Sequence, residues 1–249
     1  MSKDLFSKQS DVYARYRPGY PSELIEYILQ FIPEKRSAWD CATGNGQATV
    51  LLAKHFESVT ATDISEKQIA NAQPHPRITY SVASAENSSL PSQRFDLITV
   101  AQAYHWFNFE KFGSEANRVL KPGGVVAIWG YGHITCEITA LNTLMMSFYE
   151  NVVGPYWDPE RRYVDEHYKT VLFPFDELPG KEFIIEKIWN LEDLTGYFNT
   201  WSSVQHFITA KGFSPIGQLK LDLQNAWPEQ TNVTFRFPLF LRLGRRLPG

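Results

Sequence analysis

The chain has 249 residues, of which 43% are hydrophobic, 14% aromatic and 20% charged, and its net charge is −3 at pH 7. This composition is typical of a globular protein with a sizeable core, and the weak negative charge argues against a broad basic surface for nucleic acid. Two cysteines, Cys41 and Cys136, form no disulfide framework, and no apolar run reaches membrane-spanning length. We therefore expect a cytoplasmic protein without a membrane or nucleic-acid partner, acting as a monomer or homodimer.

The first half of the chain alternates helical and strand patterns. Apolar residues at helical spacing predict a helix over residues 22–32, which Pro33 ends. Ser65, followed three residues later by Gln68, predicts a capping box at the start of another helix. Strands are expected at 38–41, 59–63, 78–83, 95–100 and 125–129, with helices at 49–56, 66–72 and 109–120. This alternation predicts a doubly wound α/β sheet, mostly parallel, with right-handed crossovers.

The pattern changes after Trp129. Residues 131–181 are expected to be mostly helical with loops, residues 194–208 to form one amphipathic helix, and residues 183–191 and 232–246 to form the final strands. We expect a single domain with a C-terminal antiparallel strand and a helical cap inserted after strand five. Its parts are a lid segment (1–22), a cofactor-binding core (23–130), cap and acceptor-side elements (131–182 and 192–228) and the final strands (183–191 and 232–246).

A glycine-rich turn follows the first predicted strand, in the stretch that runs from Asp40 through Gly44 to Gly46. Such a turn lets a ligand lie close to the backbone, at the carboxyl ends of the strands. A dinucleotide site would have a third glycine where this chain has Thr49, and a carboxylate at position 40 would repel a pyrophosphate. The same carboxylate can pair with the ammonium group of S-adenosylmethionine. Asp63, at the end of the second strand, suits ribose hydroxyls in either cofactor, so only Asp40 and Thr49 argue against a nicotinamide dehydrogenase.

The order and spacing of several short motifs then show a family resemblance. The chain resembles class I S-adenosylmethionine-dependent methyltransferases of the trans-aconitate methyltransferase-like, type 11 group, which have a Rossmann-like sheet. The resemblance spans about residues 6–129, and the motifs that carry it lie at 13–21, 40–46, 63–65, 83–91, 95–98, 103–107 and 120–124. It implies a methyltransferase with S-adenosylmethionine as cofactor and S-adenosylhomocysteine as product, and no metal.

The resemblance also implies roles for individual residues. Gly44 and Gly46 would lie under the methionine part of the cofactor, with Asp40 near its ammonium group. Ala42 stands where the family turn has its second glycine, so we expect an ordinary φ there. Asp63 would bind both ribose hydroxyls. The full set of implied cofactor residues is Tyr13, Arg17, Asp40, Ala42, Thr43, Gly44, Gly46, Asp63, Ile64, Ser84, Ala85, Glu86 and Gln102, where Ile64 packs on the adenine and Glu86 substitutes for an acid that many relatives have at Ser84.

The acceptor is expected beyond the ends of strands four and five. Methyl transfer from a sulfonium is an in-line displacement, for which a protein mainly aligns the reactants and excludes water. A carboxylate acceptor needs no base but favours arginine or lysine nearby, whereas a hydroxyl acceptor needs a base, for which His105 is the candidate beside a purely structural role. The predicted acceptor pocket consists of Tyr16, Tyr104, His105, Trp129, Tyr131 and Trp201. We thus predict methyl transfer to a small molecule, at a carboxylate or a hydroxyl; the alternative is a cofactor-binding protein without methyltransferase activity.

Overall fold

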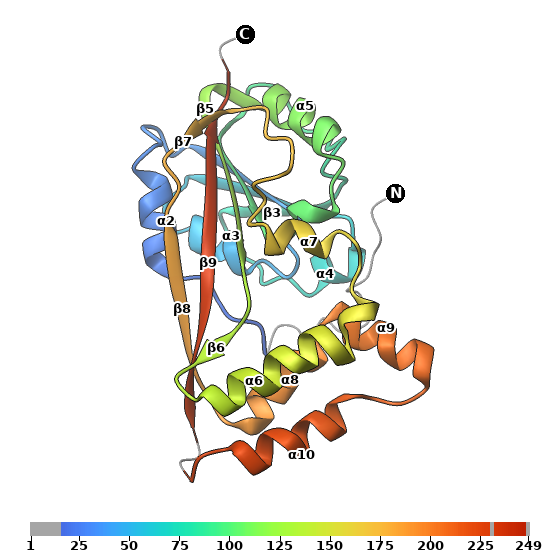
Figure 1. Ribbon diagram of the computed structural model, residues 1–249. Coiled ribbons are helices and arrows are strands. Elements are labelled where there is room, and N and C mark those ends of the chain that lie inside the picture. The colour runs from blue at the N-terminus through green and yellow to red at the C-terminus, as the bar shows by residue number, and fades with distance from the viewer. Residues whose placement is uncertain (1–15, 230–231, 248–249) are drawn as a thin grey trace.

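The computed structural model describes residues 16–229 and 232–247, and its centre is a mixed β-sheet (Figure 1). The parallel strands have the order β3-β2-β1-β4-β5, and β9 continues the sheet antiparallel to β5. Their bounds are Ser37–Cys41 (β1), Ser58–Asp63 (β2), Ile78–Val82 (β3), Phe95–Ala101 (β4), Leu120–Tyr131 (β5) and Val233–Arg245 (β9). Strand β9 also pairs with β6 (Thr135–Cys136), β7 (Asp176–Leu178) and β8 (Glu182–Trp189). The predicted fold class is confirmed.

Two hydrophobic cores lie on opposite faces of the sheet, because successive strand residues point to opposite sides. Ala38 and Leu97 belong to one core with the helices α2 (Ser22–Leu29) and α3 (Gln47–Leu52). Trp39 and Ile98 belong to the other core, which α5 (Phe109–Val119) covers. Every residue of β1 is buried, as expected for a parallel strand that is covered on both faces. The sheet therefore presents its ligand-binding edge only at the carboxyl ends of its strands.

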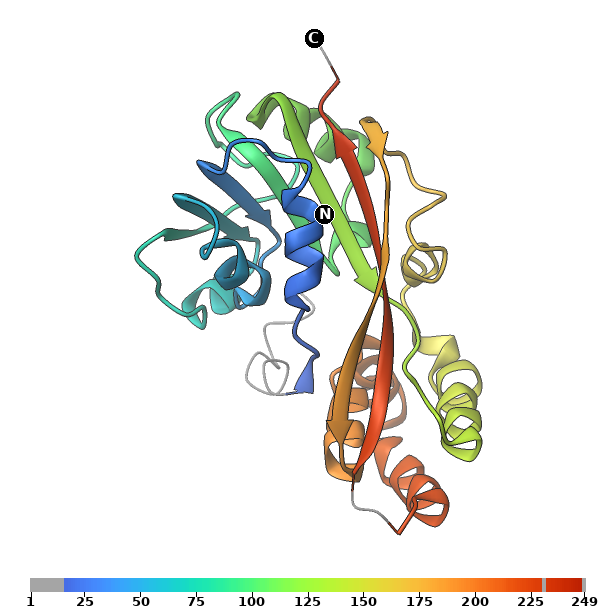
Figure 2. The ribbon, with the colours of Figure 1, turned by 90° about the vertical axis from the view of Figure 1, so that its left-hand side faces the viewer.

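A helical cap stands beyond those carboxyl ends (Figure 1), and the long β8–β9 pair extends from the sheet into it (Figure 2). Leu141, Phe198 and Leu219 of the cap belong to the same core as α2 and α3, so the cap packs continuously onto the sheet. Its elements are α6 (Thr139–Ser147), the π-helical turn η3 (Phe148–Val152), the 3₁₀ turn η4 (Gly154–Tyr156), α7 (Arg161–Asp165), α8 (Leu191–Asn199), α9 (Ser202–Lys211) and α10 (Ile216–Ala226).

The single helix predicted over residues 194–208 is wrong, because the chain forms α8 and α9 with a break between them. The hydroxyl of Thr200 donates to the Tyr197 carbonyl oxygen at 2.6 Å, and Trp201 adopts an extended backbone conformation before α9 begins. A side chain that bonds to the preceding turn competes with helix continuation. At the break, the Trp201 ring packs against Phe148 and Phe198 of the cap.

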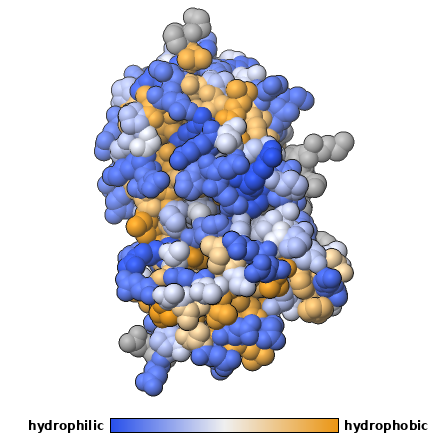
Figure 3. All heavy atoms as spheres, viewed as in Figure 1, coloured by the Kyte–Doolittle hydropathy of each residue, from blue (hydrophilic) through white to orange (hydrophobic). Residues whose placement is uncertain are grey.

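The predicted capping box at α4 (Glu66–Ala70) forms only in part. The Gln68 amide donates to the Ser65 hydroxyl at 3.3 Å, but the side-chain oxygen of Gln68 is buried with no hydrogen-bond partner among the described residues. On the face shown in Figure 3, hydrophobic residues are scattered among hydrophilic ones. No helix in residues 16–229 and 232–247 is long and apolar enough to cross a membrane. The division into lid, core and cap stays a prediction, and Tyr13 of the lid lies outside the described residues.

Candidate active site

The glycine-rich turn joins β1 to α3 with an unusual backbone. Gly44 and Gly46 have φ angles of +58° and +90°, in the left-handed region that glycine adopts at low cost. A Cβ on Gly44 would meet nothing within 4 Å, so this part of the turn is open. A Cβ on Gly46 would stand 2.7 Å from the Tyr80 hydroxyl of β3. The chain therefore needs Gly46 for its own packing, whereas Gly44 leaves room for a ligand.

Ala42 also lies in the left-handed region, with a φ of +57°, so the expected ordinary φ at this position is wrong. Gln102, directly after β4, has a φ of +54°. Strands β1 and β4 are parallel neighbours, so both residues stand at the same edge of the sheet. Left-handed conformations of residues other than glycine cost about 1–3 kcal/mol, and such strain gathers where ligands bind. The two positions mark this edge as the candidate site.

Asp40 holds the turn together from inside. The residue is 1% exposed, and its carboxylate accepts hydrogen bonds from the hydroxyls of Thr43 at 2.8 Å, of Thr99 at 2.7 Å and of Thr49. Burial raises the pKa of Asp40, and the three hydroxyls oppose that rise. The carboxylate thus ties β1, the turn, α3 and β4 to one another. The predicted contact between Asp40 and a cofactor ammonium stays a prediction.

Asp63 stands at the end of β2 beside the open part of the turn. One carboxylate oxygen accepts from the Gly44 amide and the other from the Ser65 amide, each at 2.9 Å. The next residue, Ile64, is 43% exposed although it is apolar.

Further along this edge, Ser84 donates to Glu86, and Glu86 also accepts from the backbone amide of residue 108 at 3.1 Å. Ala85 between them is buried.

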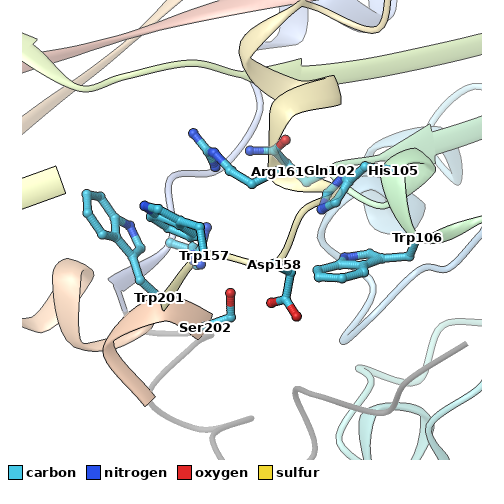
Figure 4. A pocket seen from close by; sticks show the side chains of 9 residues that line it. Gln102, His105, Trp106, Trp157, Asp158, Arg161, Trp201 and Ser202 are labelled. Atoms are coloured by element: carbon cyan, nitrogen blue, oxygen red, sulfur yellow. The ribbon is translucent and has the colours of Figure 1, made fainter. Parts of the chain in front are cut away.

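A cavity of about 50 Å³ lies where the cap meets the ends of β4 and of the 3₁₀ turn η2 (Tyr104–Trp106) (Figure 4). From the sheet side it is lined by Gln102, His105 and Trp106, and from the N-terminal segment by Arg17. The cap contributes Trp157, Asp158, Arg161, Trp201 and Ser202. Of the predicted site residues, the fold therefore brings Arg17, Gln102, His105 and Trp201 together at one cavity.

Arg17 links three parts of the protein at this cavity. Its guanidinium donates to the Tyr131 hydroxyl of β5 at 2.8 Å and to the Thr200 carbonyl oxygen of the cap at 3.3 Å. It also lies over the Tyr197 ring, 5.5 Å from the ring centre. Tyr131 was predicted to line the pocket and instead contacts it through Arg17. The residue before Arg17, Tyr16, packs against Gly196 of α8 and does not line the cavity.

Arg161 supplies a second guanidinium from α7. Its Nε donates to the Tyr149 hydroxyl at 3.2 Å and to Asp165 at 3.1 Å, and the group lies 5.0 Å from the centre of the Trp157 ring. Its two terminal nitrogens make no hydrogen bond within the part of the chain that the structure describes. These N–H groups are therefore available to a ligand with an anionic group.

His105 is a neutral imidazole. Its Nδ1 lies 2.9 Å from the Tyr168 hydroxyl. Burial, reinforced by the positive charges of Arg161 and Arg17, lowers the pKa of His105 to about 3. At neutral pH the ring therefore carries no charge and is a weak base.

Two predicted pocket residues belong to the core instead. Tyr104 is fully buried, and its hydroxyl donates to the Leu172 carbonyl oxygen at 2.7 Å, because the turn η2 directs its ring away from the cavity. Trp129 is fully buried and packs edge-on against Tyr20. The cap residues Trp157 and Asp158 were missed. Their only signal in the sequence is the aromatic, charged stretch at 156–163, which contains Arg161.

Comparisons with known proteins agree with this architecture. A family model described as a methyltransferase domain matches residues 39–128. A Dictyostelium discoideum protein that bears a methyltransferase name is 35% identical over 250 residues, which cover 98% of this chain and 95% of the relative. This chain belongs to the methyltransferase family. A methyltransferase of Aspergillus candidus is 27% identical over 226 residues, covering 79% of this chain and 70% of its own.

The methyltransferase fold is shared with a solved structure. A protein from Anaeromyxobacter dehalogenans, named as a type II methyltransferase, is 36% identical and has a TM-score of 0.86, covering 94% of this chain and 100% of that one. The resemblance to class I S-adenosylmethionine-dependent methyltransferases is thereby confirmed. Among the described residues, no group of three histidine, cysteine, aspartate or glutamate side chains is arranged to hold a metal ion.

Residues at the carboxyl ends of β1 and β2 can be compared with the chemical groups of S-adenosylmethionine. A Cβ on Gly44 would meet nothing within 4 Å, which leaves space for the methionine part. The half-buried carboxylate of Asp63 lies at the end of β2 beside the open part of the turn, and a carboxylate is the kind of acceptor that suits two ribose hydroxyls. Ile64 offers an exposed apolar side chain next to them, which suits an adenine ring. The residues present therefore fit the cofactor through the open space at the turn, an acceptor for the ribose and an apolar side chain for the adenine.

Proposed function

We propose that this methyltransferase transfers a methyl group from S-adenosylmethionine to a carboxylate oxygen of a small molecule. The observation that carries the proposal is the guanidinium of Arg161 at the cavity, whose terminal nitrogens make no hydrogen bond with described residues. A planar guanidinium binds a carboxylate through two parallel hydrogen bonds. Arg17 adds a second positive charge at the same cavity.

Another group at the cavity favours an anion as well. The indole N–H of Trp157 is buried and has no hydrogen-bond partner among the described residues. Two arginines and this indole N–H together supply donors that suit a carboxylate.

The state of His105 favours a carboxylate over a hydroxyl. A phenol or alcohol must lose a proton during methylation, and a base with a pKa of about 3 does this poorly. A carboxylate is already ionised at neutral pH, with an ordinary pKa of about 4. No residue of the cavity then needs to act as a base, and the role of His105 is to hold Tyr168 and shape the wall.

The remaining contributions of the chain are binding and alignment. We propose that Asp63 holds the ribose hydroxyls, that Ile64 packs on the adenine, and that the open backbone at Gly44 lies against the methionine part. When bound, S-adenosylmethionine supplies an activated methyl group on a positively charged sulfur. The cap closes the acceptor side with indole rings, which exclude water, and Arg161 fixes the direction of the acceptor.

Titration calorimetry with S-adenosylhomocysteine tests the cofactor assignment. We expect Asp63→Asn to weaken binding by about tenfold or more, because each hydrogen bond to a charged group contributes about 1.5–3 kcal/mol. The matched control is Asp96→Asn, since Asp96 also accepts two backbone amides but at the start of β4, on the opposite edge of the sheet. Equal affinities of the Asp63 variant and the wild type would refute the assignment.

The acceptor assignment is tested by the formation of methyl esters from a set of small carboxylic acids, followed by mass spectrometry. We expect Arg161→Gln to lower kcat/KM by about 10- to 100-fold through the lost charge-assisted hydrogen bonds. The neighbouring Arg162 lies over the Tyr163 ring and does not line the cavity, so Arg162→Gln is the control and should behave as wild type. Products methylated at a hydroxyl or amine, with the carboxylate intact, would contradict the proposal.

A further inference from the structure

Asp158 is a buried carboxylate at the acceptor cavity that the proposed function does not use. Its side chain is 8% exposed, and its Oδ2 is buried without a hydrogen-bond partner among the described residues. Arg161 lies three residues further on at the same cavity, yet the two residues share only a backbone hydrogen bond of 2.9 Å. In Figure 4 the carboxylate points toward the side of Ser202, away from the Arg161 guanidinium. The two opposite charges therefore address different parts of the cavity.

His206 does not satisfy this carboxylate. Its Nδ1 lies 3.7 Å from Oδ2 of Asp158, beyond hydrogen-bond distance, and 3.0 Å from the Tyr156 carbonyl oxygen. A carbonyl oxygen can only accept, so the proton on Nδ1 is donated to Tyr156. A buried carboxylate oxygen without a donor is costly, and such an oxygen in a cavity is what a ligand with an N–H or O–H group would pair with.

We propose that Asp158 accepts a hydrogen bond from a hydroxyl or ammonium group of the acceptor, so that the acceptor is a small hydroxy or amino carboxylic acid. This inference rests on the proposed function, in which the arginines bind the carboxylate. The donor group of the acceptor lies on the Asp158 and Ser202 side, and its carboxylate lies on the Arg161 side. The cavity of about 50 Å³ suits a compact polar acceptor of this kind.

Asp158 is thereby a specificity-determining residue. A simple carboxylic acid would fill the arginine side but leave the Asp158 oxygen buried without a donor. A site that is built to hydrogen-bond a hydroxyl or an amine discriminates strongly against an analogue that lacks it, because its own polar group is then left unpaired. The difference in affinity between a simple carboxylic acid and a hydroxy or amino acid can therefore test the role of Asp158 in the wild-type protein.

The test measures binding of four three-carbon probes to the full chain with S-adenosylhomocysteine present, by calorimetry. Propionate has the carboxylate alone, lactate adds a hydroxyl, alanine adds an ammonium group, and 1-amino-2-propanol has both donors but no carboxylate. We expect lactate or alanine to bind at least about tenfold more tightly than propionate, and whichever is preferred identifies the donor. Asp158→Asn should weaken that preference, because a neutral amide oxygen is a weaker acceptor than a carboxylate, while leaving the affinity for propionate within about twofold, and His206→Gln should keep the preference.

The outcomes separate this inference from the proposed function. Equal binding of propionate, lactate and alanine by the wild type would overturn the role of Asp158 and leave the carboxylate site intact. An unchanged preference in Asp158→Asn, or the same weakening in His206→Gln, would also overturn it. If no carboxylate binds, the proposed function fails, and the role of Asp158 then stands only if 1-amino-2-propanol binds the wild type and binds Asp158→Asn more weakly.

Discussion

Gly196 tests whether the N-terminal segment and the cap close the cavity together. It lies inside α8, where alanine normally stabilises a helix by about 1 kcal/mol over glycine. A Cβ at this position would stand 2.6–2.8 Å from three ring atoms of Tyr16. Overpacking of this kind costs about 1–3 kcal/mol. The gain and the cost are of the same order, so we expect Gly196→Ala to change the free energy of unfolding by less than about 2 kcal/mol.

The effect on activity should be larger. The side chain of Tyr16 must move, and Arg17 follows it, which breaks the 2.8 Å hydrogen bond from Arg17 to the Tyr131 hydroxyl. Loss of a properly placed guanidinium should lower kcat/KM by about tenfold or more. Gly217 is the control, because it lies in α10 with nothing within 4 Å of its missing Cβ, and Gly217→Ala should stabilise slightly at unchanged activity. Wild-type kcat/KM in a more stable Gly196→Ala would refute this coupling.

Three further predictions concern the edge of the sheet. Thr99→Val removes a buried hydroxyl that donates to Asp40, and urea unfolding should show a loss of about 1–3 kcal/mol. His105 has a pKa of about 3 in the folded state and about 6.5 when unfolded, so the unfolded chain binds the extra proton between these values. Stability should therefore fall as the pH is lowered from 6.5 toward 3, and His105→Asn should flatten that slope. Ala42→Gly relieves a left-handed backbone and should raise the free energy of unfolding by up to about 1 kcal/mol, whereas Ala210→Gly, at an exposed position of the helix α9, should lower it by a similar amount.

Much of the sheet could be predicted from sequence because its signals are local. Strands β1 and β4 are buried on both faces, β4 is a nearly continuous apolar run, and a glycine-rich turn separates β1 from α3. The break between α8 and α9 could not be predicted in this way. It depends on the Thr200 hydroxyl, on the extended backbone at Trp201, and on Arg17, a residue 183 positions away, which donates to the Thr200 carbonyl oxygen.

The same difference between local and long-range signals separates the residues of the candidate site. Asp40 and Asp63 lie at the carboxyl ends of β1 and β2, and the sequence predicts where a strand ends. Asp158 and Arg161 reach the cavity only because the cap packs onto the sheet, which is a long-range event without a local pattern. Tyr104 does follow β4, as the sequence predicts, but it does not line the pocket, because the turn η2 directs its ring into the core.

Asp40 would distinguish a sulfonium cofactor from a pyrophosphate indirectly, not by contact with its carboxylate. Its carboxylate does not face open space, because the hydroxyls of Thr43, Thr49 and Thr99 surround it, and burial raises its pKa. Where the Thr43 hydroxyl donates its proton to Asp40, a ligand at the turn meets the oxygen of that hydroxyl rather than its hydrogen. Oxygen lone pairs backed by a buried negative charge attract an ammonium group and repel a phosphate. The discrimination therefore survives, but the half-buried Thr43, not the carboxylate itself, is the group through which a ligand would experience it.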